Sequence, residues 1–162
     1  MEDRCIKVSF ETAKKWYNGD IPALKELALT VYTAAELSVK GIHEMINEIL
    51  NNKDAFFLTD TQEVQLRALH NRKDNNISAP KMLRIIALYY NRTWRKTTEN
   101  TGYFLECRKV KDGYDWVERW SIRYHQSVNY PCIAYFRTET DAQKAIEYLK
   151  MLGKLDALYT DL

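Results

Sequence analysis

The sequence predicts an α+β protein: an N-terminal helical array, then one helix, a three-stranded antiparallel sheet and a covering C-terminal helix. In the helical part, apolar residues recur at a spacing of three and four between helix-capping signals. The sheet is indicated by three stretches of alternating apolar and polar residues, Tyr103–Val110, Trp116–His125 and Cys132–Thr138. A final apolar stripe at helical spacing follows them, and this grouping of strands and helices is typical of the α+β class.

The N-terminal half is expected to consist of short helices. Ser9 is placed to cap the first, and Pro22 fits the first turn of the second, where its missing N–H costs nothing. The stretch Thr33–Glu36 has the spacing of a capping box, which predicts a third helix continuing through Leu50. A fourth helix is expected over Thr61–Asn71.

The most polar run of the chain, Asn71–Asn76, is the expected linker between two domains, residues 1–76 and 77–162, which are also able to pack as one. Ser78 then caps a helix with Pro80 in its first turn. This helix is apolar over most of its circumference, which predicts that it is buried on more than one side.

The strongest local signal in the sheet is Asp112–Gly113, because a two-residue hairpin turn needs positive φ values that this dipeptide tolerates. A hairpin centred there pairs Leu105 with Trp120 and places Glu106 opposite Arg119. Side chains alternate along a strand, so one face becomes mostly apolar and aromatic and the other becomes basic.

The C-terminal helix is expected to begin after Thr138, with Asp141 at the capping-box position, and to end at Gly153. Its apolar stripe should lie on the aromatic face of the sheet. In this arrangement Ala145 faces the sheet and Lys144 faces solvent.

Composition limits the class of protein. With 46% hydrophobic and 12% aromatic residues over 162 positions, the chain is expected to fold and to bury a core. No apolar run approaches the ~20 residues that span a bilayer, and the start Met1–Arg4 does not resemble a signal peptide. These features predict a cytoplasmic protein that does not enter membranes.

Positive charge and aromatic side chains are concentrated in the same part of the chain. Residues 80–137 hold 11 Lys and Arg against 5 Asp and Glu, together with 12 of the 20 aromatic residues. Arginines that share a sheet face can bind phosphate oxygens, and an aromatic ring beside them can stack on a base. The alternative is an ordinary solvated face, with Glu106 neutralising part of its charge. The candidate ligand-binding residues are Arg108, Arg119, Arg123, His125, Phe104, Arg137, Arg95 and Lys96.

No catalytic or metal-binding motif stands out. The 5 glycines are scattered, so the sequence has no glycine-rich phosphate loop. Cys107 and Cys132 with His125 supply at most three of the four ligands of a structural zinc site, and buried free thiols explain the two cysteines as well. A Cys–His nucleophile from the same residues stays open, because such partners need to be close only in space. We expect a protein that is not an enzyme and uses no cofactor or metal.

Five stretches, read together, carry a resemblance: Phe10–Tyr17, Leu24–Leu29 with Tyr32–Leu37, Ile85–Asn91 with Trp94, Tyr135–Thr138, and Ala142–Ile146. They resemble a diffuse set of small proteins of phages and mobile elements of gut bacteria. Arg92–Lys96 stands where these proteins more usually have a glycine-containing turn. The resemblance implies an origin in a phage or mobile element and a location in the cytoplasm of the host bacterium. It assigns no catalytic residue.

The sequence thus predicts a non-enzymatic binding protein with an anionic ligand, a nucleic acid or a nucleotide, on the basic sheet face. The alternative is a protein–protein interaction module, either a virion or assembly component or an inhibitor of a host protein. The excess of positive charge in residues 80–137 favours the first function, because an interaction module does not need it.

Overall fold

The structure, a computed structural model, describes residues 7–71, 77–126 and 132–160. The chain folds into two compact units, Met1–Gly41 and Ile42–Leu162. Residues 42–70, which the sequence predicts to be part of the first domain, belong to the second unit. Most of the expected linker lies outside the described residues. None of the described helices has the length and apolar character needed to cross a membrane.

The first unit is a small helical array. The Ser9 side chain caps its first helix, as predicted, by accepting a hydrogen bond from the backbone N–H of Thr12 at 3.2 Å. Phe10 packs edge-on against Tyr32, with the ring centroids 5.5 Å apart, and so joins the first helix to the end of the second. The helices are α1 (Phe10–Tyr17), α2 (Pro22–Val31) and α3 (Ala34–Leu37).

The expected long third helix is interrupted, so its predicted length is wrong. Its capping box at Thr33 is present, but α3 is only one turn long and α4 begins at Ile42. The Ser38 hydroxyl donates back to the carbonyl of Ala34 at 2.7 Å, a local bond that competes with helix continuation. Gly41 follows, and glycine disfavours helix by about 1 kcal/mol relative to alanine.

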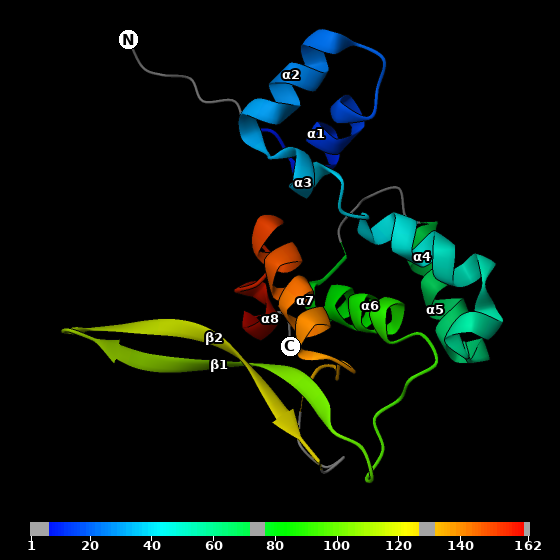
Figure 1. Cartoon of the computed structure of the whole chain (residues 1–162), viewed down its shortest axis with the longest axis vertical. Coiled ribbons are helices and arrows are strands. Elements are labelled where there is room, and N and C mark those ends of the chain that lie inside the picture. The colour runs from blue at the N-terminus through cyan, green and yellow to red at the C-terminus, as the bar shows by residue number, and fades with distance from the viewer. Residues whose placement is uncertain (1–6, 72–76, 127–131, 161–162) are drawn as a thin grey trace. The chain divides into compact units, whose positions relative to one another are not determined.

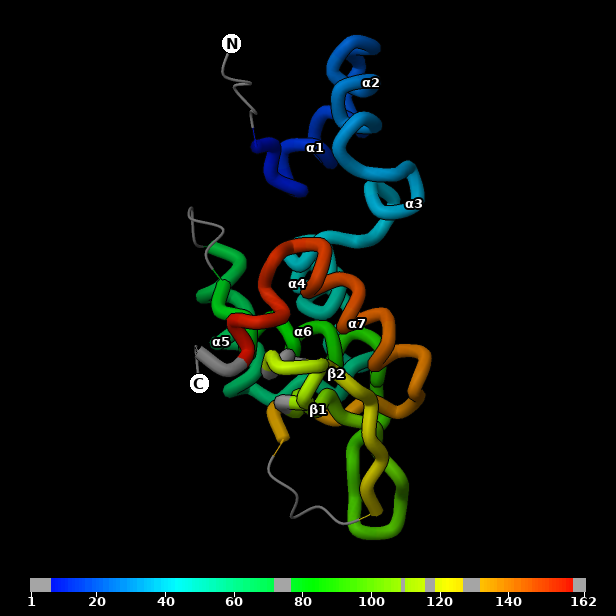
Figure 2. The backbone as a smooth tube through the Cα atoms, turned by 90° about the vertical axis from the view of Figure 1, so that its left-hand side faces the viewer, coloured from blue at the N-terminus to red at the C-terminus, as the bar shows by residue number. Residues whose placement is uncertain are grey.

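The second unit is built around α6, whose apolar character on most sides is explained by its neighbours. It packs against α4 and α7, which flank it in Figures 1 and 2. Seven of its residues are buried, including Leu83 and Ile86, which confirms burial on more than one side. The elements are α4 (Ile42–Asn51), η1 (Lys53–Phe56), α5 (Asp60–His70), α6 (Ala79–Asn91), β1 (Gly102–Asp112), β2 (Asp115–His125), α7 (Glu139–Met151) and α8 (Ala157–Thr160).

Strands β1 and β2 form an antiparallel hairpin whose turn is one residue later than predicted. Asp112 pairs with Asp115, so Gly113 and Tyr114 form the turn. Gly113 has a φ of 64°, whereas Tyr114 does not have a positive φ. Glycine at the first central position is the requirement of a type II′ turn, and this explains why Asp112–Gly113 is not the centre.

The pairing along the hairpin is therefore shifted by two positions. Leu105 pairs with Ile122, and Glu106 pairs with Ser121 rather than with Arg119. Because side chains alternate with a period of two, this shift leaves every residue on its predicted face. The separation of an aromatic face from an arginine-bearing face is kept, although its cross-strand partners change.

The predicted third strand is reduced to a single bridge between Phe136 and Tyr103. The backbone N–H of Phe136 donates to the Tyr103 carbonyl at 2.7 Å, and that of Tyr103 donates to the Phe136 carbonyl at 2.9 Å. On the other side, the amide of Asn91 donates to the Tyr135 carbonyl at 2.8 Å and accepts from the Arg137 N–H at 2.9 Å. The Asn91 side chain thus makes the hydrogen bonds that a neighbouring strand would otherwise make with Tyr135 and Arg137. The described sheet is two-stranded.

Helix α7 has the predicted cap and lies beside the sheet. The Thr138 hydroxyl accepts a hydrogen bond from the backbone N–H of Asp141 at 3.1 Å. Ala145 is fully buried and Lys144 is exposed, as expected. The helix contacts both strands, and Trp120 of the aromatic face lines a groove together with Ile146.

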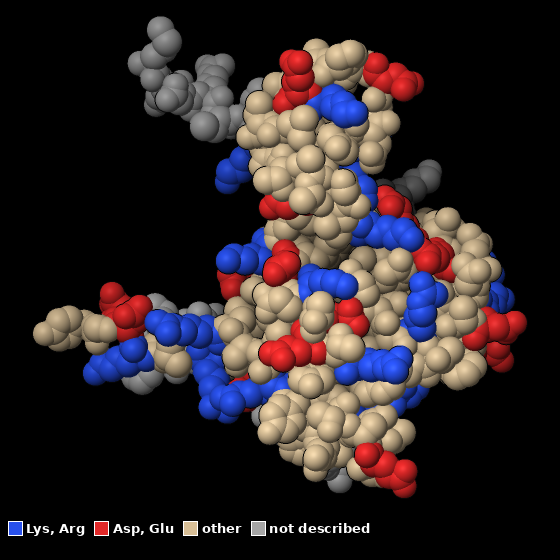
Figure 3. Space-filling view, viewed as in Figure 1, with Lys and Arg blue, Asp and Glu red and all other residues tan. Residues whose placement is uncertain are grey.

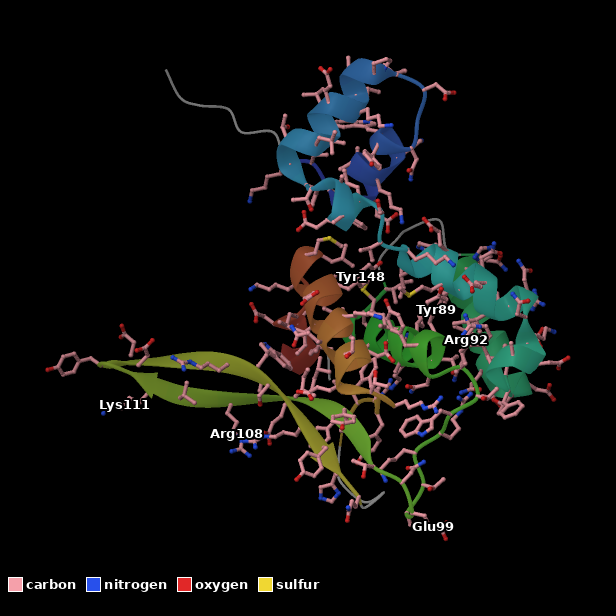
Figure 4. The ribbon with its side chains drawn as sticks, viewed as in Figure 1. Tyr89, Arg92, Glu99, Arg108, Lys111 and Tyr148 are labelled. Carbon is pink, nitrogen blue, oxygen red and sulfur yellow. The ribbon has the colours of Figure 1, made fainter. Side chains whose placement is uncertain are left out.

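The end of α6 has an unusual backbone. Arg92 adopts φ 52° and ψ −112°, a region that favours glycine. Its guanidinium lies 5.3 Å from the centre of the Phe56 ring and 3.9 Å from a carboxylate oxygen of Glu48. Figure 4 shows its side chain beside Tyr89 near α4. These contacts offset the conformational cost of the turn.

We expect Arg92→Gly to be more stable than Arg92→Ala by roughly 1 kcal/mol, because alanine loses the contacts and keeps the strain. Urea unfolding of the two variants measures the difference. At Gln143, an exposed position within α7, the order should reverse, since glycine disfavours regular helix. Alanine more stable than glycine at both positions would show that the turn at Arg92 is unstrained.

Candidate anion-binding site

The hairpin extends away from the helices of the second unit (Figure 1). Five of the candidate residues, Phe104, Arg108, Arg119, Arg123 and His125, share one of its faces. We call this the arginine face, and it also includes Gly102, Glu106, Asp112, Asp115 and Ser121. Figure 3 shows Lys and Arg side chains along the hairpin and Asp and Glu side chains near its end. The paired residues Asp112 and Asp115 adjoin the turn, so the positive charge lies in the middle of the hairpin rather than at its tip.

Two arginines face each other across the strands. Arg108 pairs directly with Arg119, and directly opposed residues have Cβ atoms about 4.5–5.5 Å apart. Like charges at this position destabilise a sheet unless something compensates for them. Among the described side chains, Arg119 forms an ion pair with Asp112, with 3.6 Å between its Nη2 and Oδ2 of Asp112, and both side chains are about two-thirds exposed.

Glu106 compensates for part of this charge by binding two arginines at once. Its carboxylate accepts from Nε of Arg108 at 2.9 Å and from Nε of Arg123 at 3.0 Å. The Glu106 side chain is 15% exposed, whereas both arginines are at least half exposed. Burial raises the pKa of Glu106, but the hydrogen bonds and charges of the two arginines outweigh it and hold that pKa below its usual range. Glu106 is therefore ionised at neutral pH.

Positive charge continues toward the base of the hairpin. Phe136 pairs with Tyr103, so the exposed Arg137 follows the bridge close to the first residue of β1, Gly102. Lys96 reaches the same corner, where its Nζ donates to the carbonyls of Asn100 at 2.6 Å and Gln126 at 3.1 Å. On the described part of this face, Glu106 is the carboxylate in the middle of the hairpin, and Asp112 and Asp115 lie beside the turn.

Gly102 makes this corner possible, a role that no sequence motif indicates. A Cβ atom at this position would lie 2.7 Å from Cδ of Lys96 and 2.8 Å from Cδ1 of Tyr135. Such contacts are too close for ordinary packing, so a larger residue would displace the Lys96 side chain and the Tyr135 ring. The partners are distant in sequence, so no local pattern could have indicated them.

Two of the candidate residues have structural roles instead. Phe104 is only 3% exposed and meets the Tyr135 ring edge-on at 5.9 Å, so its ring belongs to the core and is not presented for stacking. Arg95 donates to the carbonyls of Phe56 and Arg92, each at 2.6 Å, which joins the loop after α6 to η1. Burial lowers the pKa of Arg95. Both side chains thus have contacts within the protein, and a ligand contact of either one stays a prediction from the sequence.

The surroundings of Cys132 do not favour its thiolate form. Burial raises the pKa of the Cys132 thiol, although hydrogen bonds to Tyr135 and Ala134 oppose the shift. A raised pKa reduces the thiolate form that a nucleophile needs. Within residues 7–71, 77–126 and 132–160, no three His, Cys, Asp or Glu side chains are grouped so that they could hold a metal ion.

Comparisons with known proteins identify no relative of this chain. The chain matches no protein-family model, no curated protein and no solved structure. The face itself is visible in Figure 4, where the Arg108 side chain extends from the hairpin away from the helices. A row of exposed guanidinium groups on a projecting ribbon can bind phosphate oxygens.

Proposed function

We propose that the chain is a non-enzymatic binding protein that holds a nucleic acid against the arginine face. The observation that carries this proposal is the direct pairing of Arg108 with Arg119 while Glu106 serves Arg108 and Arg123. Arg108 and Arg123 share the Glu106 carboxylate, and Arg119 is left with the exposed carboxylate of Asp112 at 3.6 Å, so an anion on this face would relieve the repulsion between the guanidinium groups.

The spread of the charges favours a polyanion over a single nucleotide. Arg119 and Arg123 are four residues apart, which corresponds to about 13 Å along a strand. All three arginines of the hairpin are at least half exposed. A nucleotide presents its phosphates at one end, whereas a nucleic acid offers a row of phosphates that can meet several of these cations together.

Salt dependence of binding tests the proposal. Neutralised phosphates release counterions, so affinity falls with salt at a log–log slope of about −0.9 per contact for duplex DNA and about −0.7 for single strands. Arg119→Ala with Arg123→Ala should make the slope shallower by two contacts, about 1.8 or about 1.4. Fluorescence anisotropy of labelled DNA between low and moderate salt measures both slopes.

The control is Lys15→Ala, since Lys15 is an exposed cation of α1 in the first unit. It should leave the slope unchanged. If DNA does not bind at low salt, or if the double variant keeps the full slope, the arginine face is not the site. A thermal shift with nucleotides alone, lost in the double variant, would identify the smaller ligand instead. The origin in a phage or mobile element and the cytoplasmic location stay predictions from the sequence.

A further inference from the structure

A groove lies between α5 and α6, and none of its lining residues belongs to the arginine face. Both helices belong to the second unit, and α4 packs against each of them. The groove has a volume of about 370 Å³, which falls within the range of binding clefts. Most of its surface is apolar, and the side chains responsible are Leu66, Ala68, Leu69, Ile85 and Leu88.

The groove is elongated along α5. From Gln62 to Leu69 the groove follows α5 for about 10 Å, close to two helical turns.

The charged groups of this groove have one sign. Lys81 and Arg84 are three residues apart on α6, so they lie on the same side of that helix. Both are exposed, and neither forms an ion pair within the part of the chain that the structure describes. The opposite edge carries the neutral amides of Gln62 and Gln65. No carboxylate is among the described residues that line the groove.

We propose that this groove is the docking site of an acidic amphipathic helix from a protein partner. An elongated apolar groove between two helices suits the apolar side of a third helix, with anchors at positions i, i+4 and i+7. Glutamates or aspartates flanking those anchors would meet Lys81 and Arg84 at the rim, where charge complementarity selects the partner. A nucleic acid fits less well, because phosphates gain nothing from the leucine-rich floor. This site is independent of the arginine face.

A pair of synthetic peptides tests the inference on the full chain. The first has roughly 18 residues, about 27 Å of helix, with leucine anchors and flanking glutamates; in its twin every glutamate is lysine. The wild-type chain should bind the glutamate peptide about tenfold more tightly than the lysine peptide, a difference of about 1.4 kcal/mol. Lys81→Glu with Arg84→Glu should reverse this preference. Fluorescence anisotropy with labelled peptides measures all four affinities.

Two control variants locate the binding. Ala68→Asp should weaken the glutamate peptide without affecting the fold, because Ala68 lines the groove and is exposed. Arg108→Ala with Arg119→Ala should leave peptide binding unchanged, which separates this site from the proposed nucleic-acid site. Three results would overturn the inference: no binding of the glutamate peptide at low salt, equal affinity for the two peptides, or an unchanged preference in the Lys81 and Arg84 double variant.

Discussion

Ala145→Asp is expected to abolish the folding of the second unit. Ala145 is fully buried on the stripe of α7 that also includes Ala142 and Leu149. The substitution would bury a carboxylate in an apolar stripe, and an uncompensated buried charge costs about 3–5 kcal/mol. Natural domains have about 5–15 kcal/mol of stability in total, so most or all of it would be lost. Soluble yield and circular dichroism during heating measure the effect.

The matched control is Lys144→Asp, the same substitution one residue earlier. Lys144 is exposed and lies 3.4 Å from the Asp141 carboxylate, and exposed ion pairs contribute about 1 kcal/mol at most. This variant should fold and melt a few degrees below the wild type. If the two variants behave alike, the buried side of α7 is assigned incorrectly.

Phe136→Ala is expected to cost about 3–5 kcal/mol and to loosen the hairpin from its support. The Phe136 ring is fully buried, and its backbone forms both hydrogen bonds of the bridge to Tyr103. Removing the ring leaves a cavity at the point where β1 joins the rest of the unit. Urea unfolding measures the loss, and hydrogen exchange of the Tyr103 amide should become faster.

Tyr114→Ala serves as the aromatic control for this prediction. Tyr114 is fully exposed at the turn of the hairpin, and surface substitutions of this kind usually change stability by less than about 0.5 kcal/mol. A cost below about 1 kcal/mol for Phe136→Ala would mean that the bridge does not hold the hairpin.

The elements that the sequence predicted correctly depend on local signals. Ser9, Thr33 and Thr138 each cap a helix where their spacing indicates, because a cap involves only residues within three positions. The predictions are wrong where contacts between residues distant in sequence determine the structure. The segment around Phe136 is held by the Asn91 side chain, which binds Tyr135 and Arg137 from 44 and 46 residues away in the sequence. Strand propensity, a local property, cannot predict this contact.

The arginine face was predictable in part for a related reason. Strand periodicity places Arg108, Arg119 and Arg123 on one face whether or not the turn moves by one residue, because the pairing then shifts by an even number. The partner of each arginine depends on the register. The sequence therefore predicts Glu106 opposite Arg119, whereas in the structure Glu106 binds Arg108 and Arg123. The burial of Phe104 also depends on Tyr135, which no strand alternation indicates.

The claim that the arginine face binds an anion is tested most directly by Glu106→Gln. At neutral pH Glu106 is an ionised competitor for Arg108 and Arg123, since its pKa lies below the usual range. Glutamine keeps two polar groups of similar size and removes the charge. We expect DNA affinity to rise roughly three- to tenfold at low salt. Lowering the pH through the pKa of Glu106 should raise the affinity of the wild type but not that of the variant.

The control is Glu147→Gln, which removes one negative charge from the exposed side of α7. It should change the affinity little, because charges farther apart than about 10 Å are largely screened at 0.1 M salt. The measurement is the dissociation constant of the wild type and both variants at one salt concentration. A selective gain for Glu106→Gln is the predicted result. Equal affinities, or a loss for Glu106→Gln, would contradict the account.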